Sequence, residues 1–413
     1  MLLRLAWRNI WRQKRRTVLT ASAIALTLFL SLVMRAFQEG QYTHNILNNA
    51  KMGTGVVQLQ NPEYKENNSI DELLPASDEF ISDTRQIDTI DYLLPRIESF
   101  ILAASDERSK GVMLSGINPS LEDTYSNLSE RIIKGEYWSE DATGLVDGVI
   151  VGEGVAQYLG LTVGDEIVFY GQGYRGQMAA GLFEIKGIVH YPIKEMNNQL
   201  VYLSLSDAQK MFSTGNQVTS WVIGLIDLSK LPALMQQLSD AYPEGVSIRD
   251  WRDLSPELEQ SIVLDRVGGL VMMYLLYIVV GFALFATLLM MTLERLREFS
   301  VMLATGMART QLLRLIAIES SLIGLLGIVV GVVTASPLLL YFYQHPIRLT
   351  GEMAQAMLDM GYEPVMPVSL DPALFQEQIV IVAAITMICL VYPMWRVMRL
   401  DAVSGLKGGF HAH

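Results

Sequence analysis

The stretch VGGLVMMYLLYIVVGFALFATLLMMTL, from Val267 to Leu293, contains no charged residue over its whole length. About 20 apolar residues are enough for an α-helix to cross the hydrocarbon core of a bilayer. This run is therefore predicted to be a transmembrane helix. The rest of the chain fits this setting, because 51% of its residues are hydrophobic and only 18% are charged, whereas charged residues make up about 25% of a typical soluble domain.

Three further apolar runs have a comparable length, at Thr17–Phe37, Leu315–Tyr343 and Ile379–Trp395. The first of them follows a long basic start and exceeds the roughly 7–15 residues of the apolar part of a signal peptide, so we expect an uncleaved anchor helix. The sequence thus predicts four transmembrane helices, at residues 17–39, 266–293, 312–343 and 379–395.

Short basic segments flank these helices. Residues 1–16 contain six Lys and Arg and no acid, and residues 294–314 contain four arginines. The end of the chain, residues 396–413, is also basic. Because short cytoplasmic segments carry an excess of Lys and Arg, we predict that the N-terminus, the segment 294–311 and the C-terminal tail are cytoplasmic.

Residues 40–265 and the loop 344–378 then lie on the outer side. The longer segment holds 15 Lys and Arg against 33 Asp and Glu, an acidic balance that does not favour binding to nucleic acid. It is also too long for a loop, so we predict a large α+β extracytoplasmic domain inserted between the first and second transmembrane helices.

The outer segment contains short β-branched or aromatic runs bounded by Gly, Pro, Asn or Asp, which predict strands. These runs are Gly55–Gln60, Ser99–Ser105, Gly111–Ile117, Gly148–Glu153, Asp165–Gly171, Leu182–Tyr191, Gln199–Leu205 and Ser220–Ile226. Patterns at helical spacing, with helix-capping residues, predict helices at Gly154–Gly160, Ser206–Phe212 and Asp227–Tyr242.

The sequence offers no recognisable catalytic chemistry. It has one cysteine, Cys389, inside an apolar run, and five scattered histidines. It lacks the phosphate-binding pattern G-x-x-x-x-G-K-[ST], the nucleophile pattern G-x-S-x-G and the zinc pattern H-E-x-x-H. We therefore predict no catalytic, cofactor-binding or metal site in this chain.

Two stretches resemble known families. GVIVGEGVAQYLGLTVGDEIVFYG, Gly148–Gly171, resembles the outer-domain signature of MacB-type ABC permeases. LERLREFSVMLATGMARTQLLRL, Leu293–Leu315, resembles the "ER-x-RE-[IF]…G" cassette of the FtsX-type permease core. The later segments Ile318–Ser320 and Tyr392–Gly408 follow in the family's order, although Ala402 stands where proline is usual. Helix count, inserted domain and length are most similar to the lipoprotein-releasing permeases LolC and LolE.

The resemblance implies a permease subunit in the bacterial inner membrane that is not itself an enzyme. Two copies of a separate ABC ATPase would bind ATP and Mg, and a second permease subunit would complete a homo- or heterodimer. ATP hydrolysis would drive mechanotransmission, which extracts or expels a lipoprotein, lipid or other hydrophobic substrate toward a periplasmic carrier. The alternative is an FtsX-like regulator of an extracytoplasmic cell-wall hydrolase.

The resemblance also implies that residues 294–311 form a cytoplasmic coupling helix that docks in the ATPase. An ordinary helix at the membrane interface is the alternative from the residues alone. Leu296, Phe299 and Leu303 share one helical face, which we expect to fill the ATPase groove, and Arg295 can pair with Glu298 three residues on. The predicted coupling residues are Glu294, Arg295, Leu296, Arg297, Glu298, Phe299, Leu303 and Gly306.

Several positions inside the predicted membrane helices stand out. Glu319 is an intramembrane carboxylate, which is costly in lipid and is expected to face the bundle interior, for function or for pairing with another helix. The candidate substrate-facing residues are Met272, Met273, Tyr274 and Tyr277, with an ordinary membrane core as the alternative. A stripe of small residues, Gly324, Gly327 and Gly331, allows close helix packing, which we expect to form a dimer seam.

Overall fold

The computed structural model describes residues 2–12, 14–64, 69–138, 148–242, 244–359 and 362–399. The chain divides into two compact units, which are described separately. The helical unit contains the described residues of Met1–Gln41, Val263–Ile347 and Met366–His413, and the sheet unit contains those of Tyr42–Ile262 and Arg348–Val365. The part of the predicted C-terminal tail beyond Arg399 lies outside the described residues.

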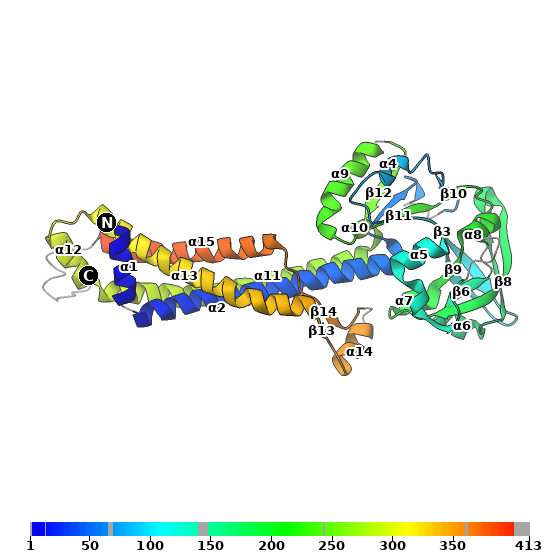
Figure 1. Ribbon diagram of the computed structural model, residues 1–413. Coiled ribbons are helices and arrows are strands. Elements are labelled where there is room, and N and C mark those ends of the chain that lie inside the picture. Colours follow the sequence, from blue (N-terminus) through cyan, green and yellow to red (C-terminus); the bar gives the residue numbers. More distant parts are fainter. Residues whose placement is uncertain are drawn as a thin grey trace. The chain divides into compact units, whose positions relative to one another are not determined.

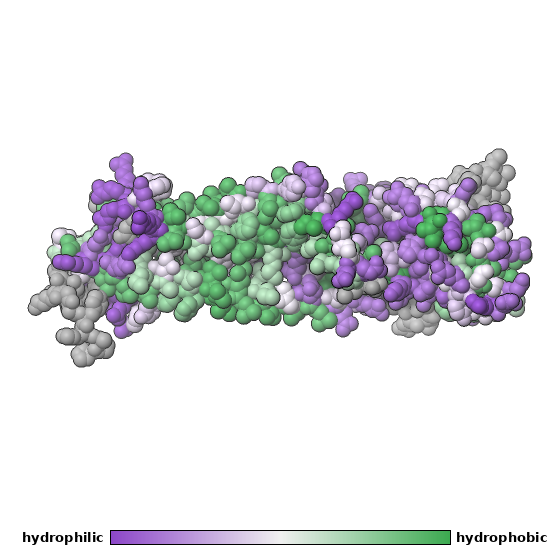
Figure 2. Space-filling model, turned by 90° about the horizontal axis from the view of Figure 1, so that it is seen from below, coloured by the Kyte–Doolittle hydropathy of each residue, from purple (hydrophilic) through white to green (hydrophobic). Residues whose placement is uncertain are grey.

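The helices that build the helical unit are mostly long (Figure 1). They are α1 (Leu2–Arg12), α2 (Lys14–Asn49), α11 (Pro256–Glu294), α12 (Leu296–Ala304), α13 (Arg309–Gln344) and α15 (Pro372–Met398). Among the described residues, four helices are long and apolar enough to cross a membrane: α2, α11, α13 and α15. Figure 2 shows hydrophobic side chains along these helices. A long apolar helix is thus present at each of the four predicted membrane segments.

The glycine stripe of α13 packs inside the chain. A side chain at Gly327 would meet the Ala21 carbonyl oxygen and Ile24 of α2, and one at Gly331 would meet the Ala25 carbonyl oxygen and Leu28. Glycine at these positions therefore lets α13 lie directly on α2. The expectation that the stripe forms a dimer seam is wrong for these two glycines, because α2 already covers them.

The sheet unit is built on a ten-stranded mixed sheet with the order β12-β1-β11-β3-β4-β9-β6-β8-β5, and β7 pairs with β3 and β8. Its strands are β1 (Val57–Gln60), β3 (Tyr92–Ala104), β4 (Ser109–Ile117), β5 (Ile132–Gly135), β6 (Val149–Gly152), β7 (Glu166–Gln172), β8 (Met178–Val189), β9 (Leu200–Ser204), β11 (Ser220–Gly224) and β12 (Ser247–Asp250). A second, two-stranded sheet pairs β2 (Leu74–Pro75) with β10 (Gln217–Val218).

The helices of the sheet unit are short (Figure 1). They are α4 (Ser82–Arg85), α5 (Pro119–Ser126), α6 (Glu153–Leu159), α7 (Lys194–Gln199), α8 (Leu205–Phe212), α9 (Leu231–Ala241), α10 (Trp251–Leu254) and α14 (Glu352–Asp359). A five-residue π-helical turn, Ala50–Thr54, follows α2, and two short strands, β13 (Ile347–Arg348) and β14 (Val365–Met366), flank the α14 segment.

The predicted α+β class of this unit is confirmed, and all eight predicted strands are present as β1, β3, β4, β6, β7, β8, β9 and β11. Sequence patterns missed β5, β12 and the first half of β3. Pro95 hid that half, because proline lacks a backbone N–H for the ladder. Here Pro95 lies opposite Trp221 of β11, so the neighbouring strands hold it in the sheet despite its low propensity.

A buried arginine joins three elements of the sheet unit. Arg96 of β3 donates hydrogen bonds of 3.1 and 2.7 Å to the carboxylate of Glu122 on α5, and a further one to the backbone oxygen of Gly53. Burial alone lowers the pKa of Arg96, but the Glu122 and Glu98 carboxylates outweigh it and raise that pKa above its ordinary value. This pair fixes the end of α2 and its π-turn to the sheet.

The close contact between α2 and α13 can be tested by substituting Gly327→Leu. Leucine favours helices more than glycine does, so any loss of stability must come from its clash with α2. Overpacking of this kind costs about 1–3 kcal/mol. We expect a lower melting temperature for the purified protein in detergent. The matched control is Gly268→Leu on α11, where an added Cβ meets nothing within 4 Å; equal melting temperatures for the two variants would contradict the packing.

Candidate functional site

The charged segment between α11 and α13 folds as a short helix between two breaks. α11 ends at Glu294, Arg295 leaves the helical conformation, and α12 then runs from Leu296 to Ala304. Gly306 follows with a φ of 101°, a left-handed conformation that favours glycine. α13 begins at Arg309. A turn at Gly306 therefore separates α12 from α13.

One face of α12 packs inside the helical unit. Leu296 is 4% exposed and Phe299 only 1%, and they form a cluster with Leu312 and Ile316 of α13 and Val397 of α15. Leu303 is half-buried at the edge of this cluster. The expectation that Leu296 and Phe299 fill a groove in a partner needs correction, because the chain's own helices already occupy this face.

The opposite face of α12 is open. Arg297, Val301 and Ala304 are exposed on it, and so are Thr305 and Gly306 at its end. Val301 exposes 46% of its surface, so a branched apolar side chain lies among charged and small neighbours. A partner that binds this segment would meet this exposed face and not the apolar face predicted from the sequence.

Glu319 of α13 is paired. Its carboxylate receives hydrogen bonds from the guanidinium of Arg295 and from Nδ2 of Asn9 on α1 at 2.6 Å. Arg295 and Glu319 have side chains only 4% and 3% exposed. An unpaired charge buried in this way is strongly unfavourable. The expected pairing of Glu319 with another segment is present, and the segment is the one between α11 and α13.

A second set of ion pairs joins the same segment to the start of the chain. Arg12 of α1 lies 2.6 Å from Glu298, and Arg16 of α2 pairs with Glu294. The predicted pair of Arg295 with Glu298 is confirmed at 3.3 Å. Both acids of the segment thus face the basic N-terminal residues, and exposed pairs of this kind each contribute roughly 0–1 kcal/mol.

Sequence patterns missed Asn9, Arg12 and Arg16 as members of this cluster. A usable signal was present: residues 1–16 hold six bases and no acid, while the segment between α11 and α13 supplies Glu294 and Glu298. Opposite charges on short segments at the same membrane side are natural partners. The sequence gives no such signal for Asn9, because a single amide side chain on a short helix does not indicate which acceptor it will bond to.

The four candidate substrate-facing residues of α11 divide between two faces. Met273 and Tyr277 are buried within the helical unit, and the Tyr277 hydroxyl donates to Oε1 of Gln378 on α15. Met272 and Tyr274 are exposed. At about 100° per residue, Met272 and Tyr274 point to opposite sides of α11, one on each side of the buried face. Contact with a substrate therefore stays a prediction for these two exposed residues.

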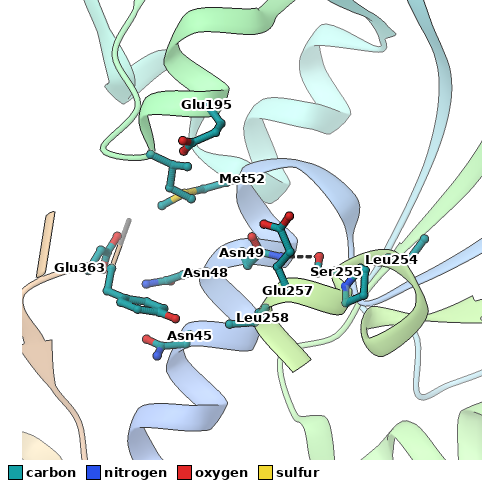
Figure 3. A pocket seen from close by; sticks show the side chains of 13 residues that line it. Asn45, Asn48, Asn49, Met52, Glu195, Leu254, Ser255, Glu257, Leu258 and Glu363 are labelled. Atoms are coloured by element: carbon teal, nitrogen blue, oxygen red, sulfur yellow. Dashed lines mark hydrogen bonds between the residues drawn. The ribbon is translucent and has the colours of Figure 1, made fainter. Parts of the chain in front are cut away.

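The sheet unit contains an open groove of about 480 Å³ (Figure 3). Three amides of α2 line it, those of Asn45, Asn48 and Asn49, and Asn49 donates to the Ser255 hydroxyl at 2.7 Å. Met52 of the π-helical turn also lines it. The other lining residues lie around α7, around the start of α11 and in the segment before β14, and they are Ile193, Glu195, Leu254, Pro256, Glu257, Leu258, Tyr362 and Glu363.

The chemistry of this groove is rich in hydrogen-bond acceptors. Glu195, Glu257 and Glu363 supply three carboxylates. A hydrogen bond from His44 lowers the pKa of Glu363 below its ordinary value, and the amide of Asn48 adds to this effect. The groove therefore suits polar ligands with N–H or O–H donors. The spacing of Asn45, Asn48 and Asn49 on one helical face, directly after an apolar run, was the signal that the sequence offered.

Comparison with known proteins places both units in families. Residues 17–241, more than half of the chain, match the MacB-like periplasmic core domain. Residues 270–402 match the FtsX-like permease C-terminal family. The chain is an ABC transporter permease of the MacB/FtsX type. It is a multi-pass membrane protein, and the MacB-like match covers most of α2 and most of the sheet unit of this permease.

Two relatives of the permease are the lipoprotein-releasing system transmembrane proteins LolC of Xylella fastidiosa strains 9a5c and Temecula1. Each is 22% identical over 327 residues, which cover 76% of both chains. An uncharacterized ABC transporter permease protein of Mycobacterium tuberculosis is 24% identical over 253 residues, 58% of this chain and 27% of that relative.

Two solved structures similar to the permease are of outer domains. The periplasmic region of MacB from Actinobacillus actinomycetemcomitans matches with 15% identity and a TM-score of 0.36, over 52% of this chain and 98% of that one. The extracellular domain of the ABC-type transporter YknZ from Gram-positive bacteria matches with 15% identity and a TM-score of 0.33, over 47% and 99% of the chains.

The buried pair of the permease predicts a non-additive response. Glu319→Leu leaves the Arg295 guanidinium buried with only Glu298 as an acid, so we expect a loss of about 3–5 kcal/mol in stability. Arg295→Met leaves the carboxylate uncompensated and should cost a similar amount. The double variant Arg295→Met/Glu319→Leu removes both charges and should regain most of the loss, because apolar replacements of buried pairs are often neutral.

The measurement is the thermal melting of the four proteins in the same detergent. Additive losses in the double variant would show that the two side chains do not depend on each other. Arg309→Gln serves as the control, because Arg309 is exposed and bonds only to a backbone oxygen at the end of α15 among the described residues.

Proposed function

We propose that this permease is the mechanotransmission subunit of an ABC complex. Two copies of a separate ATPase subunit, which bind ATP and Mg, and a second permease subunit, identical or related, complete the complex. Family membership supports the ATPase partner, because ABC permeases do not hydrolyse nucleotide themselves. The lipoprotein-releasing relatives support a substrate of the lipoprotein, lipid or hydrophobic class, extracted from the outer side of the inner membrane and passed to a periplasmic carrier.

The two-faced packing of α12 is the observation that carries the coupling proposal. Its outer face, with Arg297 and Val301, is free to dock in the ATPase. Its inner face, with Leu296 and Phe299, is fixed to α13 and α15. A displacement of the outer face by the ATPase is then transferred directly to two membrane helices. Arg295 adds a second connection to α13 through Glu319.

The eight coupling residues therefore take different roles in the proposal. Arg297, with the newly recognised Val301, contacts the ATPase, whereas Leu303 packs at the edge of the inner cluster. Leu296, Phe299 and Arg295 hold α12 on the bundle, and Glu294 and Glu298 hold it to the basic N-terminal residues. Gly306 supplies the left-handed turn into α13. No specific feature of the described residues favours the regulator of a cell-wall hydrolase.

On the outer side, the exposed part of α11 and the groove of the sheet unit are the proposed substrate surfaces. Met272 and Tyr274 present apolar side chains from a membrane helix, suited to acyl chains. The groove around Asn48 and Glu257 presents hydrogen-bond acceptors, suited to a polar head or an extended polypeptide. The two kinds of surface match the two chemistries of a lipid-linked substrate.

The proposed orientation predicts a labelling pattern. In a Cys389→Ala background, a cysteine at exposed Asn216 should react with a membrane-impermeant maleimide added outside intact spheroplasts. A cysteine at exposed Ala304 should react only after the membrane is opened. The basic segments around α1 and α12 are the reason for this expectation. Reaction of Ala304→Cys in intact spheroplasts would reverse the topology.

The coupling proposal predicts that α12 variants separate docking from transmission. Val301→Asp places a charge on the exposed face, where loss of an interface hot spot costs on the order of 2 kcal/mol. We expect weaker copurification of the ATPase. Gly306→Val strains the turn, because its φ of 101° is unfavourable for a branched residue. We expect this variant to keep the ATPase and to lose substrate-stimulated turnover.

Both variants are compared in lipid nanodiscs with Gln344→Glu, an exposed substitution at the far end of α13. Copurification of the ATPase and ATP turnover, with and without a lipoprotein, are measured for each. If Val301→Asp shows wild-type assembly and turnover, the proposal that α12 contacts the ATPase is wrong. If a cell-wall hydrolase stimulates ATP turnover and a lipoprotein does not, the permease is a regulator of that hydrolase.

A further inference from the structure

Helix α1 has an apolar stripe on its exposed side. Leu3, Trp7 and Trp11 recur every four residues and are 65%, 56% and 54% exposed, so they form one line along the helix. The rings of Trp7 and Trp11 contact each other edge to face, with centroids 5.9 Å apart. Three large apolar side chains aligned in this way on an 11-residue helix are unusual in contact with water.

The other side of α1 holds the helix in place. Ala6 and Ile10 are buried, and Ile10 packs in a cluster with Ala21 of α2, Met291 of α11 and Ile323 of α13. Asn9 bonds to Glu319 from the same side. α1 is therefore fixed to the ends of three apolar helices, at the level where their hydrocarbon-facing surface gives way to charged residues.

Positive charge flanks the stripe. Arg4, Arg8, Lys14 and Arg15 are exposed, and no ion pair joins any of them to an acid among the described residues, whereas Arg12 and Arg16 are paired. Lys14 lies 5.8 Å from the ring centroid of Trp11. The cationic groups thus lie beside the tryptophan rings without carboxylates of their own chain to neutralise them.

A hollow of about 650 Å³ adjoins the end of the stripe. Trp11 forms part of its wall, and five bases against two acids line the rest: Arg12, Lys14, Arg15, Arg16 and Arg295, with Glu294 and Glu298. The remaining excess of positive charge suits an anion, and the volume lies in the range of about 300–1,000 Å³ that is typical of small-ligand sites. The indole of Trp11 gives the hollow an apolar edge.

These features fit an amphipathic helix at a lipid surface. Tryptophan is enriched at the level of lipid headgroups, and Lys and Arg beside it attract anionic lipids. A protein partner would also bury apolar side chains, but it would need acids to match four bases without an ion pair, two on α1 and two at the start of α2. The phosphates of a bilayer supply that charge continuously, next to helices that already require lipid.

We propose that α1 and the adjoining hollow form a binding surface for acidic phospholipids. Leu3, Trp7 and Trp11 insert into the headgroup layer, Arg4 and Arg8 contact phosphates along the helix, and Lys14 and Arg15 bind one headgroup in the hollow. The residues proposed to contact lipid lie outside the exposed face of α12, so lipid binding and ATPase docking use different side chains. It does not depend on the topology, since it requires only a bilayer around the four long helices.

The test uses the full-length permease in vesicles of phosphatidylcholine mixed with phosphatidylglycerol. Brominated chains, which quench tryptophan, are placed on one lipid or on the other at equal amounts. The signal of Trp7 and Trp11 is the difference between the wild type and Trp7→Phe/Trp11→Phe. We expect stronger quenching of this signal by brominated phosphatidylglycerol, because the acidic lipid is enriched beside α1.

The charge variant Arg8→Gln/Arg15→Gln should reduce this enrichment by about fivefold for each base removed. Arg8→Lys/Arg15→Lys should restore it, because charge and not the guanidinium geometry attracts the lipid. The matched control Lys230→Gln/Arg348→Gln removes two exposed bases from the sheet unit and should leave the enrichment unchanged. Melting temperatures confirm that each variant is folded.

Three outcomes would overturn the proposal. Equal quenching by the two brominated lipids would show that the surface does not select acidic headgroups. An equal loss in the Lys230→Gln/Arg348→Gln control would assign the effect to net charge alone. Full quenching of Trp7 and Trp11 by aqueous acrylamide, together with loss of ATPase copurification in the charge variant, would show that α1 contacts a protein partner.

Discussion

A carboxylate inside an apolar helix needs a partner, and the arrangement at one end of the helical unit follows from this constraint. Glu319 lies within α13, where an unpaired charge is strongly unfavourable in lipid. Arg295 forms an ion pair with this carboxylate, and both side chains are almost fully buried. Arg295 can do so only if α11 ends before it and the chain turns back toward α13. The break between α11 and α12 is therefore tied to the charge pair.

The same pair gives α12 its orientation. Once Arg295 points toward α13, the helical period places Leu296 and Phe299 on the bundle and Arg297 and Val301 on the open side. Asn9 and Arg12 bring α1 to the same cluster. A short helix that is buried on one face and open on the other suits force transfer, because a push on the open face moves packed helices and not a loose loop.

The sheet unit uses a comparable device at the other end of α2. Arg96 and Glu122 form a buried pair that also holds the backbone at Gly53, within the turn that ends this helix. The apolar part of α2 thus packs on the glycines of α13. The turn that ends α2 is held in the sheet unit by the hydrogen bond from Arg96.

The sequence by itself determined the four membrane helices, the inserted α+β domain and the ABC permease family. Run length, strand alternation and motif order are local properties, and a bilayer or a sheet allows few alternatives to them. The pairing of Arg295 with Glu298 was predictable for the same reason. Only the tertiary structure decided which face of α12 is buried, because that choice depends on Leu312, Ile316 and Val397, which lie in other helices. It also decided that Met273 and Tyr277 face inward, that Gly327 packs on α2, and that Asn9, Arg12 and Arg16 belong to the cluster. These outcomes depend on contacts between segments far apart in the chain, and a single sequence states which side chains are present but not which of them meet.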